Sequence, residues 1–156
     1  GQGAWDFALT TDGSMIGVDG LAIGVGYGEA ENGAFAGSTL GDEQHSTAFA
    51  NYSVGPVTFG YQMSYINSNV LGTDDRQTDA WGLAFNVNEN LSVSYGERDV
   101  VYTDNAGDVT EKFDGIAVAY TMGSMKIAGN MNEVSDNDGT AGSNDEMTEI
   151  AVSFAF

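Results

Sequence analysis

Cysteine, long apolar runs and cationic residues are absent or scarce in this chain. Its 156 residues include no cysteine, which excludes a disulfide framework and a thiolate metal site. No window of about eighteen or more apolar residues occurs, so no transmembrane helix is expected. Only four Lys and Arg stand against 23 Asp and Glu, which gives a formal charge of −19. Nucleic-acid binding is excluded on this ground, because phosphate contacts need clustered cations.

Proline is almost absent, and glycine is abundant. The chain has one proline and 22 glycines, a composition that argues against long helices. Disorder fits poorly, because 42% of the residues are hydrophobic and 11% are aromatic. The length is that of a single domain, which we expect to cover residues 1–156 and to be all-β.

Strict alternation of large and small side chains is the main pattern that is present. The clearest example is 150–156, where Ile, Val, Phe and Phe alternate with Ala, Ser and Ala. Side chains on a strand alternate between the two faces of a sheet, so one face is bulky and apolar and the other nearly bare. Nine such segments are predicted, at 4–10, 21–28, 47–54, 57–66, 80–87, 91–100, 115–122, 125–132 and 150–156. The bare face favours a closed barrel with lipid outside over a soluble sandwich.

The connections between these segments alternate in length. Tight connections are expected at Gly55-Pro56, 88–90 and 123–124, and long ones at 29–46, 67–79, 101–114 and 133–148. Outer-membrane barrels have short turns at one rim and long loops at the other. Most of the acidic residues fall in the long connections. The phase of 47–54 stays open, because Phe49 opposes Tyr52 and Val54 in the alternation.

We therefore predict a transmembrane, antiparallel, up-and-down β-barrel to which this chain supplies eight or nine strands. Nine is an odd number, whereas bacterial single-chain barrels have even strand counts. We expect the chain to be the C-terminal part of a longer barrel. The alternative is that 4–10 is a loop or plug piece and that the remaining segments form a complete eight-stranded barrel.

Four stretches resemble the C-terminal half of Gram-negative general porins, in particular those of marine alphaproteobacteria: 52–57, 85–96, 116–123 and 151–156. The resemblance covers 45–156, whereas 1–44 are similar to the family only in the general character of their sequence. It implies a barrel of about sixteen strands, a homotrimer, and passage of small hydrophilic solutes across the outer membrane of a Gram-negative bacterium. The terminal Phe156 is similar to the family's C-terminal signal for the barrel assembly machinery. The constriction loop of the family is not identifiable here.

Two sets of residues follow from a barrel. Aromatic residues near the segment ends predict girdles at the two membrane interfaces. They are Trp5, Tyr27, Tyr65 and Trp81 toward the outer rim, and Tyr52, Phe85, Tyr120, Phe154 and Phe156 toward the inner rim. Polar residues of the bare face predict the lining of a water-filled path, namely Asp6, Gln62, Asn86, Ser92, Ser94, Arg98, Lys126 and Asn130.

Both sets have a structural alternative. The aromatic residues suit cross-strand pairs in a soluble sheet as well, and any single polar residue is tolerated inside a barrel. Arg98 and Lys126 are the sharper candidates, because cations are so scarce, and either could pair with an acid across the lumen.

The acidic loops supply the oxygen ligands that Ca²⁺ and Mg²⁺ prefer. Asp136, Asp138, Asp145 and Glu146 are candidates for loosely held divalent ions, with a solvated acidic surface as the alternative. No specific metal site and no cofactor are expected. The only histidine, His45, is expected in an exposed loop.

No enzymatic motif is recognisable, and no catalytic residue is predicted. We expect a porin segment that lets small hydrophilic solutes and ions diffuse passively, with a preference for cations because of the acidic mouth. Expected partners are outer-membrane lipid, lipopolysaccharide, the barrel assembly machinery and further copies of the chain. The alternatives are a complete eight-stranded barrel for adhesion or anchoring, without an open pore, and a soluble secreted all-β binding module.

Overall fold

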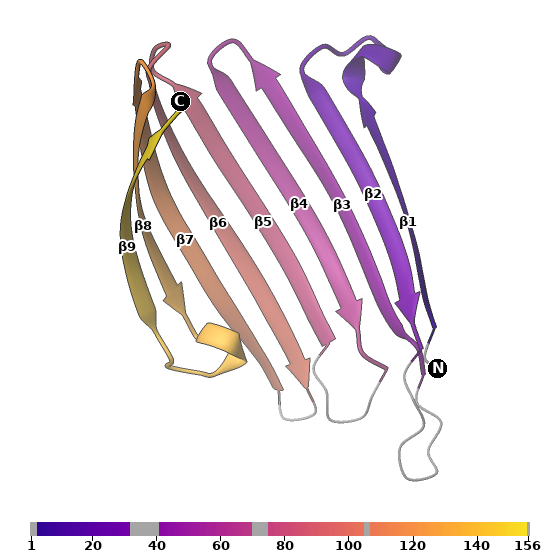
Figure 1. Cartoon of the computed structure of the whole chain (residues 1–156). Helices are drawn as coiled ribbons and strands as arrows, with labels where there is room; N and C mark the ends of the chain where they lie inside the picture. Colours follow the sequence, from indigo (N-terminus) through magenta and orange to yellow (C-terminus); the bar gives the residue numbers. More distant parts are fainter. Residues whose placement is uncertain (1–2, 32–40, 70–74, 105–106, 156) are drawn as a thin grey trace.

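The sheet contains nine strands in strict sequence order (Figure 1). The computed structural model describes residues 3–31, 41–69, 75–104 and 107–155. All neighbouring strands are antiparallel: β1 (Ala4–Asp12), β2 (Leu21–Ala30), β3 (Glu43–Val54), β4 (Val57–Asn67), β5 (Asp75–Asn86), β6 (Leu91–Asp104), β7 (Gly107–Met122), β8 (Met125–Ser135) and β9 (Asp145–Phe154). Two 3-10 turns, η1 (Gly13–Ile16) and η2 (Asn137–Gly139), are the other elements. Within the described ranges, no helix is long and apolar enough to cross a membrane. The predicted all-β, up-and-down architecture is confirmed.

Three tight connections lie at one edge of the sheet, and the long connections from β2 to β3, β4 to β5 and β8 to β9 lie at the other. The tight ones join β3 to β4, β5 to β6 and β7 to β8 at the upper edge of Figure 1, as predicted. Gly55 and Gly123 open the two-residue turns with φ of 55° and 61°. A positive φ at the first central position is what a type II′ hairpin turn needs, and glycine adopts it without steric cost. We call the two edges the tight-turn edge and the long-connection edge.

The predicted long connection at 101–114 is wrong. β6 continues to Asp104 and β7 begins at Gly107, so these strands are 14 and 16 residues long. The apolar alternation stops at Glu97 and Asp114, and the predicted segments accordingly end at 100 and begin at 115. The hydrogen-bonded ladder does not depend on apolar side chains, and it continues past both residues. The same reason explains why β3 and β5 begin several residues earlier than predicted, at Glu43 and Asp75.

The two faces of the sheet differ along its whole width. We call the face that carries Trp81, Leu83 and Phe85 the bulky face, and the opposite face the small face. Cross-strand pairing places Tyr52 and Val54 on the bulky face, which settles the phase of β3. Phe49 lies on the small face opposite Gly24, where any side chain on the glycine would overlap its ring.

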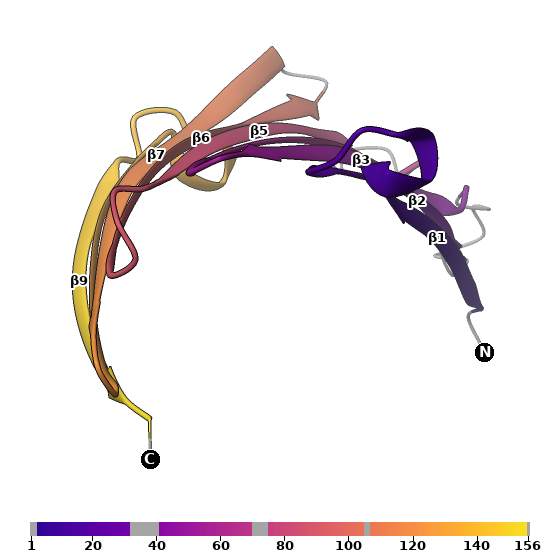
Figure 2. The ribbon, with the colours of Figure 1, turned by 90° about the horizontal axis from the view of Figure 1, so that it is seen from above.

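The sheet is a single curved layer that forms an open arc (Figure 2). β1 and β9 are its two edge strands. Residues 4–10, the possible plug piece, form most of β1 and pair in register with β2, so that alternative is wrong. Leu9 is 67% exposed and Ile150 76% exposed, both on the bulky face. In the described part of the chain no second layer covers these side chains.

Candidate functional site

All eight residues predicted to line a lumen lie on the small face. Cross-strand pairing places there Asp6, Gln62, Asn86, Ser92, Ser94, Arg98, Lys126 and Asn130. The η2 turn contacts this face and lies inside the curve of the arc, so the small face is the concave one (Figure 2). A shared concave face is the arrangement that a polar lumen needs. That these residues line a water-filled path stays a prediction.

A row of bare backbone crosses the middle of the small face. Four glycines are consecutive partners across β4 to β7: Gly60, Gly82, Gly96 and Gly115. The side-chain oxygens of Asn51 and Asn132 lie over the two outer glycines, where an added methyl group would overlap them. The wall therefore presents peptide groups and amides rather than large side chains at this level, which leaves room for water and small solutes.

The charges of the chain are divided unevenly between the two faces. Three of the four cationic residues, Arg76, Arg98 and Lys126, lie on the small face. They share it with six described acidic side chains, namely Asp6, Asp12, Glu43, Glu111, Asp145 and Glu149. Much of the acidity that makes the whole chain so negative therefore lies on the bulky face and in the connections. The small face is only mildly acidic.

Arg98 forms an ion pair on this face. Its Nη2 donates to Oε1 of Glu111 at 2.7 Å, and its Cζ lies 5.3 Å from the centroid of the Phe113 ring. The Arg98 side chain is 47% exposed, whereas that of Glu111 is only 6% exposed. The acid that pairs with Arg98 is therefore on the adjacent strand, not across the lumen. The guanidinium is fixed from two sides while one part of it still meets solvent.

Three residues of this region fall in predicted connections but lie in strands. The side-chain alternation predicts connections at 67–79 and 101–114, whereas the structure places Arg76 in β5, Tyr102 in β6 and Glu111 in β7. Arg76 lies over the Tyr102 ring, with 5.1 Å between Cζ and the centroid. The scarcity of cations would have pointed to Arg76 as it did to Arg98. His45 is exposed as expected, but it lies in β3 rather than in a loop, and its Nε2 is 2.7 Å from Oε1 of Glu43.

The predicted girdle residues that the structure describes lie on the bulky face, and all but Trp81 are near the expected edge. Trp5, Tyr27 and Tyr65 are near the long-connection edge, and Tyr52, Phe85, Tyr120 and Phe154 are near the tight-turn edge. Trp81 is in the middle of β5, because this strand begins at Asp75 rather than at the predicted residue 80. Phe156 lies outside the described residues. A membrane-interface role for these rings stays a prediction.

Carboxylates accept hydrogen bonds from several rings of the bulky face. The Tyr27 hydroxyl donates to Glu29 at 2.5 Å, and the Trp81 Nε1 donates to Glu97 at 3.2 Å. Tyr61, Tyr65 and Tyr95 donate in the same way to Asp79, Asp75 and Glu97, at 2.5, 3.3 and 2.6 Å. Each ring thus has its apolar part toward the apolar band and its polar atom toward charge, as rings do at a membrane interface.

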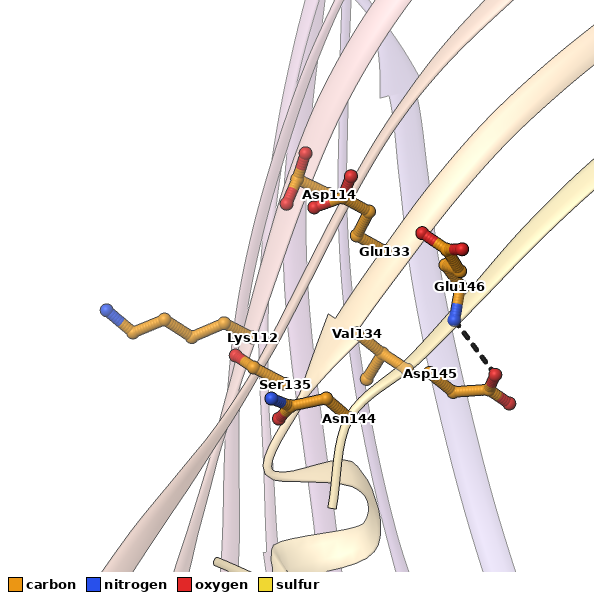
Figure 3. Close-up of a pocket in the computed structure, with 8 residues that line it drawn as sticks. All are labelled: Lys112, Asp114, Glu133, Val134, Ser135, Asn144, Asp145 and Glu146. Carbon is orange, nitrogen blue, oxygen red and sulfur yellow. Dashed lines mark hydrogen bonds between the residues drawn. The ribbon is translucent and has the colours of Figure 1, made fainter. Parts of the chain in front are cut away.

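An acidic hollow of about 440 Å³ lies beyond the apolar band, at the long-connection edge of β7 to β9 (Figure 3). Asp114, Glu133 and Glu146 are successive cross-strand partners, and the Lys112 amino group points away from them. Asp145 accepts a hydrogen bond from the Glu146 N–H at 2.8 Å. No group of three or more His, Asp or Glu suited to a metal ion occurs among the residues that the structure describes. Divalent-ion binding by Asp136, Asp138, Asp145 and Glu146 stays a prediction.

Comparison with known proteins shows the fold. No family model and no curated protein matches this chain. The solved structures that match include in-vitro folded OmpT, an outer membrane protein of Vibrio cholerae, and outer-membrane expressed OmpT of the same organism. Both have a TM-score of 0.66, with 13% and 16% identity, and both alignments cover 97% of this chain. They cover 52% and 54% of the OmpT chains, so this chain spans about half the length of the structures it matches.

Fold and face chemistry together define the class of protein. The sheet has the fold of an outer-membrane β-barrel, which agrees with the predicted location in the outer membrane of a Gram-negative bacterium. At this level of identity the likeness concerns the fold alone, and transport, substrate and partners are proposals.

Proposed function

We propose that this chain forms part of the wall of an outer-membrane porin that admits small hydrophilic solutes and ions by passive diffusion. The observation that carries the proposal is the division of all nine strands into a bulky apolar face and a small polar one. Apolar side chains on the convex side suit hydrocarbon, and small polar groups on the concave side suit a wet lumen. The proposed activity is transport without catalysis.

The barrel that we propose has more strands than the nine described. Backbone groups at an open sheet edge cannot be left without partners in hydrocarbon, because no water reaches them. β1 and β9 therefore need further strands to pair with. The OmpT structures, of which this chain covers about half, support a barrel of that larger size. In an eight-stranded barrel the side chains fill the interior, so a water-filled lumen requires more than eight strands.

Weak cation preference is part of the proposal. Among the side chains that the structure describes, three cationic residues stand against six acidic ones on the small face, and more acids lie in the connections at the long-connection edge. Such a field raises the local concentration of cations near the mouth. The preference is expected to be modest, because Arg98 neutralises Glu111.

The chain's two lysines provide the test. Lys126 lies on the small face, and Lys112 lies on the bulky face beside the acidic hollow. In planar bilayers under a salt gradient, the reversal potential should show cation preference. Lys126→Glu should increase that preference, whereas the matched control Lys112→Glu should leave it nearly unchanged. A channel that prefers chloride would defeat the selectivity proposal, and the absence of any conductance from correctly folded protein would defeat the pore.

The partners are proposed on the same basis. Three copies are proposed to form a trimer, and light scattering in detergent tests this. Lipopolysaccharide and divalent ions are proposed to meet the acidic hollow, and Phe156 is proposed to bind the assembly machinery. Deletion of Phe156 should then reduce the amount of protein in the outer membrane without changing the conductance of molecules refolded in vitro.

A further inference from the structure

The connection between β8 and β9 folds back over the small face. We call residues 136–144, which include η2, the η2 strap. The backbone N–H of Asp138, in this connection, donates to Oε2 of Glu111 on β7 at 2.7 Å. The backbone of Gly139 lies on the Tyr102 ring so closely that an added Cβ would be 2.9 Å from its Cγ. Figure 2 shows the turn on the concave side of the arc, so the strap projects toward the proposed lumen.

The strap covers a small buried cluster. Tyr102 is 8% exposed, Val100 7% and Glu111 5%, and all three lie on the small face of β6 and β7. In the described ranges, Val100 and Tyr102 are the only large hydrophobic residues that are buried. Burial of a carboxylate is tolerated because both Glu111 oxygens are hydrogen-bonded, one to Arg98 and one to the strap. Glu111 thus joins the wall to the strap.

The strap is also held by contacts within itself. The Asn137 N–H donates to the Ser143 carbonyl at 2.8 Å, and the Ser143 N–H donates to that of Thr140 at 3.0 Å. The Gly142 N–H donates to Oδ1 of Asp136 at 2.6 Å. A connection with this many internal and wall contacts keeps a defined position, unlike an open surface loop.

We propose that the η2 strap is a fixed constriction at the outer mouth of the pore, and that Glu111 is the positioning residue that holds it there. The proposal rests on the pore function proposed above. A segment anchored on the concave wall occupies cross-section that solutes would otherwise use, so its position contributes to the size limit for passage. Arg98 belongs to the same device, because its hydrogen bond to the other carboxylate oxygen orients Glu111 toward the strap.

Removal of the Glu111 carboxylate is the first test. Glu111→Ala in the complete natural chain, folded into vesicles, should release the strap. The Asp138 amide then exchanges its hydrogen faster, by roughly tenfold or more for the loss of a hydrogen bond to a charged acceptor. Single-channel conductance should rise, and larger sugars should enter vesicles faster relative to small ones. Glu149→Ala is the matched control, because it removes an acid of the same face whose carboxylate accepts from Asn130 of the wall rather than from the strap.

A second pair of variants moves the strap without changing any charge. Gly139→Ala drives a methyl group into the Tyr102 ring and should displace the strap, with the same rise in conductance. Gly142→Ala is its control, because Gly142 has a similar φ, 78° against 69° for Gly139, and no atom lies within 4 Å of the added Cβ. The strain of a positive φ is therefore common to both variants, and only the contact with Tyr102 differs.

The possible outcomes distinguish a failure of the strap inference from a failure of the porin proposal. Faster exchange together with unchanged conductance and size limit would show that the strap does not constrict the pore, and this would overturn the inference while the porin proposal stands. Unchanged exchange in Glu111→Ala would overturn the anchoring role. A wild-type protein without conductance would remove the pore itself, and the inference with it.

Discussion

A single arginine placed on one face or the other of β7 measures which face meets lipid. Val118 lies within the apolar stretch of β7, is 42% exposed on the bulky face, and has Val93 and Gly129 as partners. Val118→Arg is expected to cost about 2–4 kcal/mol if this position is near the bilayer midplane. That corresponds to a loss of roughly 30- to 700-fold in the folding equilibrium.

The neighbouring residue supplies the control. Ala119 points to the small face between Ser92 and Ala128, where an arginine has space and water within reach. Ala119→Arg should therefore cost far less than Val118→Arg. The measurement is the urea midpoint in phospholipid vesicles, followed by tryptophan fluorescence. Equal or reversed costs would refute the assignment of the faces. A wild-type chain that stays monodisperse in buffer without detergent would refute the premise that Val118 contacts hydrocarbon.

Three further predictions concern the turn edge and the rings. Gly17→Ala should cost about 1 kcal/mol for its left-handed backbone, whereas Gly20→Ala should cost about 1–3 kcal/mol more, because its methyl group overlaps a carbonyl oxygen of β3; equal urea midpoints would contradict this. Trp81, in a variant whose other tryptophan is phenylalanine, should be quenched more by lipids brominated near the headgroup than at mid-chain. Tyr61→Phe should lower the urea midpoint more than Tyr120→Phe, because the Tyr61 hydroxyl donates to a carboxylate at 2.5 Å.

Side-chain alternation was sufficient to predict the strands and the tight turns, but it failed where small residues occupy the bulky face. In β3 the bulky-face positions between Ser46 and Tyr52 are Ala48 and Ala50, which are indistinguishable by size from small-face residues. Only pairing with β2 and β4 settles the phase. The large ring of Phe49 fits the small face because Gly24, opposite it, has no side chain.

The strap and its anchor were beyond sequence reasoning for a different reason. The apolar pattern ends at Asp114 on β7, so nothing local indicates that Glu111 continues the strand or that its carboxylate is buried. Its partners come from other elements, Arg98 from β6 and the N–H of Asp138 from the β8–β9 connection. Contacts that depend on the register of three strands and the path of a connection cannot be read from residue spacing.

The two edge strands also bear on how the protein enters the membrane. Half of the backbone donors and acceptors of β1 and β9 point away from the sheet. Transfer of each such group into hydrocarbon without a hydrogen-bond partner costs several kcal/mol. Stepwise, strand-by-strand insertion is therefore disfavoured energetically. Closure of the ring has to precede or accompany the crossing of the bilayer, so the kinetics of folding and of insertion should show a single shared barrier.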